Sequence, residues 1–232
     1  MAESDPTKTH AVQALLAVPH EARDGAWLQR FYAAVPDASF ASTPEQHLVG
    51  PDAFPYFVLL SPTPGQPFTP FSISEILTHC TDHGLGIVVD PERPHPSWVF
   101  PYGNLWSLRA HGSLAGDPAD EPGENAGTNV VSQAREILVG APSEAFLPPW
   151  ARKELRSYLI DAVGLADPQV CLVIDATLKP SQNLVFNLFT DDPPLKMPHA
   201  TVMERLGWYL PPGRGLLSFA RGTLNPSGFL PL

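Results

Sequence analysis

The chain has 232 residues, a formal net charge of −10 and 28 prolines, and charged residues make up only 16% of it. A chain this acidic is repelled by phosphate backbones, so we expect no nucleic-acid partner. The 44% apolar content argues against wholesale disorder. The sequence contains no run of 18 apolar residues, so we also expect no membrane partner.

The amino-terminal residues and the cysteines indicate the compartment. The segment 1–5 lacks the basic and apolar regions of a signal peptide. The only cysteines are Cys80 and Cys171, and two thiols in a chain without an export signal are expected to be reduced and buried. We therefore expect a cytoplasmic protein of bacterial style.

The first half of the chain alternates helix and strand signals. Asp24 can cap a helix whose apolar residues recur every three or four positions, and Pro36 ends it. Ser72 and Glu75 have the spacing of a capping box, and the helix that they open is expected to end near Gly84. Apolar, β-rich runs predict strands at 56–60, 86–90 and 98–102.

A stretch rich in Gly, Pro and acidic residues separates this half from the next. It covers residues 112–128 and predicts a linker or long loop between a first lobe, 1–111, and a second lobe, 129–232. In the second lobe, Pro148 and Pro149 open a helix that ends at Gly164. A further helix is predicted at 201–210, and strands at 170–175, 184–189 and 215–219.

These patterns predict an α+β fold class with two small lobes, each mixing helices with a short sheet. In both lobes a Gly-x-Gly step, at 84–86 and at 213–215, leads from the second helix into the strand that follows it. Two related lobes would account for this similarity. Chance is the alternative, because connections from helix to strand favour glycine in general.

Two histidines form the densest group of metal-ligating side chains. His79 and His83 lie four residues apart on a predicted helix, so both imidazoles could face one ion. No third ligand stands at a matching spacing, and the alternative is a pair of solvated histidines favoured by the helix dipole. We expect no metal and no cofactor, with His79 and His83 as the alternative metal ligands.

The sequence offers no catalytic residue set. No serine lies in a Gly-x-Ser-x-Gly elbow. Cys171 lies in an apolar run, where burial raises a thiol pKa instead of lowering it. Both Gly-x-Gly steps precede a strand, in the reverse of the order that a dinucleotide site needs. Asp191 and Asp192 lack the spacing of a calcium loop.

Aromatic residues are concentrated in the segment 98–106, where four of them fall within nine positions. Aromatic side chains with a polar edge commonly anchor protein–protein interfaces, whereas packing in the core is the alternative for most of these rings. Trp106, beside Arg109 and the linker, is expected to be the exposed anchor. The candidate partner-binding residues are Trp98, Phe100, Tyr102, Trp106 and Arg109.

Two segments resemble the SseB family, which is named for enhanced serine sensitivity. The run at 84–91, followed by 98–105, resembles its N-terminal domain, and the stretch from Pro148 to the strand at 215–217 resembles its C-terminal domain. The resemblance covers most of residues 22–220. It implies a two-domain α+β protein without an established set of catalytic residues.

We therefore expect a non-enzymatic protein-binding or regulatory protein, of adaptor or immunity type. Enzymes need convergent titratable groups, and this chain has few charged residues. Its acidity suits a basic protein partner through electrostatic steering. The alternative is a small hydrolase that uses His79, His83 or a Cys–His pair formed between the lobes. The oligomeric state is left open.

Overall fold

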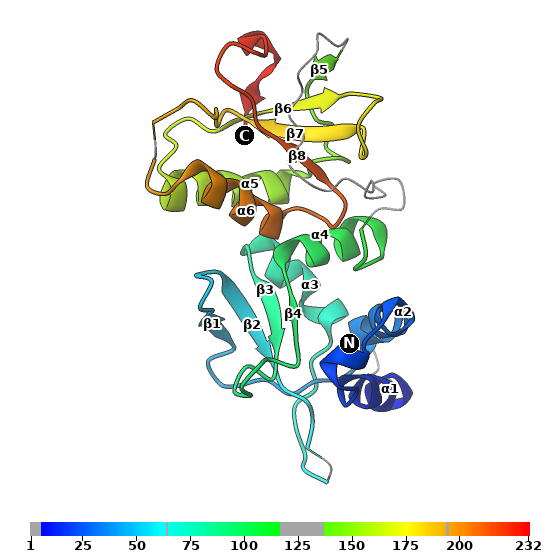
Figure 1. Cartoon of the computed structure of the whole chain (residues 1–232). Helices are drawn as coiled ribbons and strands as arrows, with labels where there is room; N and C mark the ends of the chain where they lie inside the picture. The colour runs from blue at the N-terminus through cyan, green and yellow to red at the C-terminus, as the bar shows by residue number, and fades with distance from the viewer. Residues whose placement is uncertain (1–5, 64, 117–136, 194) are drawn as a thin grey trace. The chain divides into compact units, whose positions relative to one another are not determined.

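The computed structural model describes residues 6–63, 65–116, 137–193 and 195–232. The chain divides into two compact units, Met1–Ala115 and Gly116–Leu232. In the part of the chain that the structure describes, six α-helices accompany two mixed sheets of four and five strands, which confirms the α+β fold class (Figure 1). Most of the predicted linker, from residue 117 to 128, lies outside the described residues.

The first unit contains a four-stranded sheet in the order β1-β2-β3-β4, in which only the β2–β3 pair is parallel. Its elements are α1 (Pro6–Leu16), α2 (Gly25–Ala34), β1 (His47–Val49), β2 (Pro55–Leu59), α3 (Ile73–Asp82), β3 (Gly86–Val89), β4 (Trp98–Phe100) and α4 (Tyr102–His111). Short 3-10 turns follow α1 and α2, at His20–Ala22 and Val35–Asp37.

Local signals place the starts of α2 and α3. Asp24 accepts a hydrogen bond from the backbone N–H of Trp27 at 2.7 Å, which satisfies one of the donors left open at the first turn of α2. At α3, Ser72 and Glu75 form both hydrogen bonds of the capping box. The sequence predictions for these two helix starts are confirmed.

One face of the first sheet is covered by helices. Phe57, Ile87 and Phe100 lie opposite one another on β2, β3 and β4, so they point to the same face. They belong to one apolar core with side chains of α1, α2 and α3, among them Phe31, and the helices are seen together beside the sheet in Figure 1. Phe31 and Ile87 have no exposed surface.

The second unit contains a sheet in the order β5-β6-β7-β8, and β9 pairs with the start of β6. Only the β7–β8 pair is parallel. Its elements are β5 (Leu138–Gly140), α5 (Pro149–Tyr158), a π-helical turn (Leu159–Val163), β6 (Gln169–Ile174), β7 (Gln182–Phe186), α6 (His199–Tyr209), β8 (Gly215–Leu217), a 3-10 turn (Pro226–Gly228) and β9 (Leu230–Pro231).

The carboxyl-terminal segment packs on the face of this sheet that carries Cys171 and Val185. Leu224 belongs to the same apolar cluster, and Phe219 and Phe229 pack against it. Figure 1 shows α5 and α6 together on the other side of the sheet. Among the described helices of both units, none combines the length and the apolar character needed to cross a bilayer.

The two units share a strand order. In each, an antiparallel pair (β1–β2 or β6–β7) is followed by a helix (α3 or α6) and then by a strand parallel to the second strand of the pair (β3 or β8). The connection from α3 to β3 passes Gly84 with φ 66°, and that from α6 to β8 passes Gly213 with φ 86°, a left-handed conformation that favours glycine. The repeated order of elements noted in the sequence is therefore present in the topology.

Candidate functional site

Most of the predicted partner-binding residues are buried in the interior of the first unit. Phe100, Tyr102 and Trp106 each have 0% exposed surface, and Trp98 is half-buried. The expectation that Trp106 is an exposed anchor is wrong. Residues 102–111 form the helix α4, and six of its residues, Trp106 included, are buried. The sequence has no apolar stripe there from which the direction of Trp106 could be read.

Trp98 and Phe100 take part in an aromatic cluster of the core. The ring of Trp98 lies 5.2 Å from that of Trp27 and 5.1 Å from that of Phe31, and the Phe31 and Phe100 rings stack at 5.9 Å. Arg23 lies over Trp27, with its guanidinium carbon 4.8 Å from the ring centre. These contacts are those of core packing, which was the alternative interpretation of the segment.

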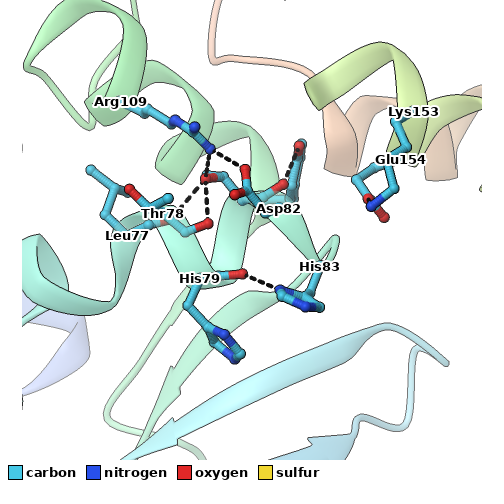
Figure 2. Close-up of polar contacts among 10 residues, drawn as sticks. Leu77, Thr78, His79, Asp82, His83, Arg109, Lys153 and Glu154 are labelled. Carbon is cyan, nitrogen blue, oxygen red and sulfur yellow. Dashed lines mark hydrogen bonds and ion pairs between the residues drawn. The ribbon is translucent and has the colours of Figure 1, made fainter. Parts of the chain in front are cut away.

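Arg109 forms contacts with residues of its own unit. It forms an ion pair with Asp82 at 2.5 Å and donates a hydrogen bond to Thr81 at 2.6 Å (Figure 2). Tyr102 donates to the backbone oxygen of Thr81 at 2.9 Å. Arg109 and Tyr102 therefore join α4 to the last turn of α3. These contacts stabilise the first unit and do not involve a partner.

A cluster of three histidines lies on the surface of the first unit, and we call it the histidine cluster: His47, His79 and His83. His79 and His83 come from the end of α3, as the spacing predicted, and their ring centres are 4.5 Å apart (Figure 2). His47 comes from β1, and its ring stacks on that of His79 at 5.6 Å and 10°. The three side chains are exposed.

Sequence reasoning missed His47. It pairs with Phe57 across the β1–β2 ladder, so its side chain points to the face that α3 covers. Phe57 lies edge-on to both imidazoles, with ring centres 5.5 Å from His47 and 6.2 Å from His79. A three-residue strand far from α3 in the sequence gives no local signal of this approach, and only the pairing of β1 with β2 could have revealed it.

The surroundings of His79 favour its neutral imidazole. Desolvation lowers the pKa of His79 below its usual value, and the charges of His83 and His47 lower it further, against the opposing effect of Asp82. His83 lies with Nδ1 2.8 Å from the backbone oxygen of His79, so Nδ1 donates to this oxygen and Nε2 takes no part in the contact (Figure 2). Neutral imidazole is the form that accepts protons or binds metals.

The two thiols are buried in apolar surroundings. Burial raises the pKa of Cys80 to about 12 and that of Cys171 to about 11. Both side chains are fully buried, so the prediction of buried thiols is confirmed. A protonated, shielded thiol is a poor nucleophile.

A serine–histidine contact in the second unit was also missed by sequence reasoning. His199, the first residue of α6, lies with Nε2 2.9 Å from the hydroxyl of Ser218. That hydroxyl donates its proton to the backbone oxygen of Leu188 at 2.9 Å, so it accepts the N–H of the imidazole. A general base would have to accept from the hydroxyl instead, and the pair therefore does not supply the nucleophile and base that a hydrolase needs.

Within the described ranges, no group of three or more His, Cys, Asp or Glu side chains is arranged to hold a metal ion. Comparisons of the chain with protein-family models, with curated proteins and with solved structures found no match. The geometry of the two units is therefore the basis for a functional proposal.

Proposed function

We propose that this is a non-enzymatic binding or regulatory protein that acts by contacting another protein. The observation that carries the proposal is an exposed, proline-rich segment of the first unit, residues 61–63 and 65–70, which we call the proline loop. Its side chains from Thr63 onward are exposed, and Phe68 retains 40% of its surface in solvent. Figure 1 shows this loop projecting from the first unit between β2 and α3.

The proline loop is held firmly at its base. Leu60 and Phe71, the residues that flank it, pair with the adjacent residues Ala41 and Phe40 through backbone hydrogen bonds of 2.8–2.9 Å. Ser61 donates from its backbone N–H and its hydroxyl to Asp90, at 2.7 and 2.8 Å. A loop with a fixed base loses less conformational freedom when it binds than a free segment would.

The composition of the loop suits recognition by another protein. The ten residues 61–70 include four prolines and no charged residue. Proline-rich segments favour the extended polyproline conformation, which aromatic grooves on other proteins recognise. An exposed aromatic ring such as that of Phe68 is a common anchor of protein interfaces. The net charge of −10 adds a preference for a basic partner.

The proposal includes the cytoplasmic location, the bacterial origin and the membership in the SseB family expected from the sequence. The α+β topology of both units supports the family membership, because the resemblance implies two such domains.

A photo-crosslinking experiment tests the contact. Benzoylphenylalanine placed at Phe68 should capture a distinct protein in cells, because the side chain would lie in the interface. Leu195, in the second unit, is the matched control, since it is also 40% exposed and lies outside the proline loop. Equal capture of the same proteins from both positions would contradict the proposal. In a separate co-purification assay, the Phe68→Ala variant should retain less of the captured protein than the unmodified chain does, and equal retention would also contradict the proposal.

A further inference from the structure

The histidine cluster brings together side chains from two elements, the strand β1 and the helix α3. His47 is the first residue of the edge strand β1, and His79 lies one turn before the end of α3. Both rings rest edge-on against Phe57, which packs in the core with 2% exposed surface. A rigid apolar base fixes the position of exposed imidazoles, and a preformed arrangement lowers the cost of binding a ligand.

The distance between the two imidazole nitrogens is the informative quantity. The Nε2 atoms of His47 and His79 lie 3.4 Å apart. This separation is longer than the 2.7–3.2 Å typical of a hydrogen bond from nitrogen. Two nitrogens bound to one tetrahedral ion at about 2.0–2.1 Å are separated by about 3.3–3.4 Å. The separation is compatible with two ligands of a shared metal ion.

His83 supplies the neighbouring position. Its Nδ1 donates to the backbone oxygen of His79, and such a bond to a carbonyl commonly orients a metal-binding histidine and leaves Nε2 as the ligand atom. The ring centres of His79 and His83 are 4.5 Å apart.

We propose that His47 and His79 bind a divalent transition-metal ion through their Nε2 atoms, with His83 beside it. The charged group nearest in sequence, Asp82, is held by Arg109, and the thiol of Cys80 is buried in the core. The ligand atoms are therefore imidazole nitrogens, which suit zinc, copper and nickel and not calcium or magnesium. Water completes the coordination at this exposed site. The bound ion links β1 to α3.

Titration of the full-length, tag-free protein with Cu²⁺ or Zn²⁺ in a calorimeter tests the proposal. The expected result is one ion per chain, with an affinity at least tenfold lower in the His47→Ala and His79→Ala variants. His95→Ala is the matched control, because His95 is also exposed and belongs to the turn between β3 and β4. It should bind as the unmodified protein does.

Electron paramagnetic resonance of the Cu²⁺ complex provides a second measurement. The spectrum should show coupling to two or more imidazole nitrogens, and one fewer in the His47→Ala or the more conservative His47→Gln variant. Circular dichroism checks that the variants are folded. If His47→Ala and His47→Gln keep both the affinity and the nitrogen coupling, the proposal is wrong. Absence of binding by the unmodified protein would refute it too, and neither result would affect the role proposed for the proline loop.

Discussion

The cysteines Cys80 and Cys171 lie in separate apolar clusters, one in each unit. The reactive species of a thiol is the thiolate, and with pKa values of about 12 and about 11 neither cysteine forms it near neutral pH. We predict that the native protein does not react with a thiol reagent at pH 8, whereas the protein unfolded in guanidinium chloride reacts at both positions.

The sign of the pH dependence follows from the raised pKa values. Raising the pH increases the thiolate fraction, so modification should begin at Cys171, whose pKa is about 11, before Cys80, at about 12. The Cys171→Ser and Cys80→Ser variants each leave one thiol and allow the two rates to be measured separately. Reaction of either native thiol at pH 8 at the rate of free cysteine would contradict this.

The single residues that the sequence did and did not reveal differ in one respect. The burial of Cys171 followed from its immediate neighbours, which form an apolar run along β6. The direction of Trp106 depended on how α4 lies in its unit, and the contact of His47 depended on the pairing of β1 with β2. Local sequence patterns indicate whether a residue lies in an apolar run, and they do not indicate how one element packs or pairs with another.

At the scale of elements, each parallel strand pair begins at a glycine that lies close to a side chain of the neighbouring strand. Gly86 pairs with Tyr56, and a Cβ atom at Gly86 would lie 2.7 Å from the backbone oxygen of Phe100 and 2.8 Å from the Tyr56 ring. Gly215 pairs with Asn183, whose amide oxygen would overlap a Cβ atom at Gly215. The glycines at the ends of the Gly-x-Gly steps are therefore required by close approach.

We predict that Gly86→Ala destabilises the protein by about 1–3 kcal/mol, because a backbone atom cannot move aside to accommodate the methyl group. The matched control is Gly140→Ala, also in a strand, where a Cβ atom would meet nothing within 4 Å. The control should change the free energy of unfolding by less than about 1 kcal/mol. Urea unfolding of both variants measures the difference, and equal effects would show that the contact at Gly86 does not restrict the strand.

The elements with local start signals were predicted well. The helices α2 and α3 begin with side-chain caps, and α5 begins at Pro149 as expected from its proline pair. The helix α1 was missed although it also begins at a proline, Pro6. The strands β1 and β5 were missed because they have three residues each, fewer than the four or more from which a strand is predicted, and they carry the exposed residues Val49 and Leu138.

At the scale of the molecule, the same order of pairing appears twice, and the sequence revealed it through element order and the two Gly-x-Gly steps. Each unit adds further elements around this shared portion, and of these the sequence predicted only β4. The first unit adds the parallel strand's antiparallel neighbour β4 and the helices α1 and α4, whereas the second adds β5 and β9 along the edge of β6. The histidine cluster and the proline loop both belong to the first unit, so its residues carry both proposals.

The charge of the whole molecule acts on binding differently from the proline loop. A net charge of −10 attracts a basic partner over a distance set by the salt concentration, about 10 Å at 0.1 M. The contact at Phe68 acts only once the two proteins touch. We therefore predict that salt lowers the association rate with the partner, whereas Phe68→Ala raises the dissociation rate.

Surface plasmon resonance with the partner captured at Phe68 separates these effects. The association rate should fall as sodium chloride rises from about 0.05 to about 0.5 M, with a much smaller change in the dissociation rate. The Phe68→Ala variant should keep this salt dependence because its charge is unchanged. An association rate that does not vary with salt would argue against a basic partner, even if the loop contact itself is confirmed, since the contact does not depend on long-range attraction.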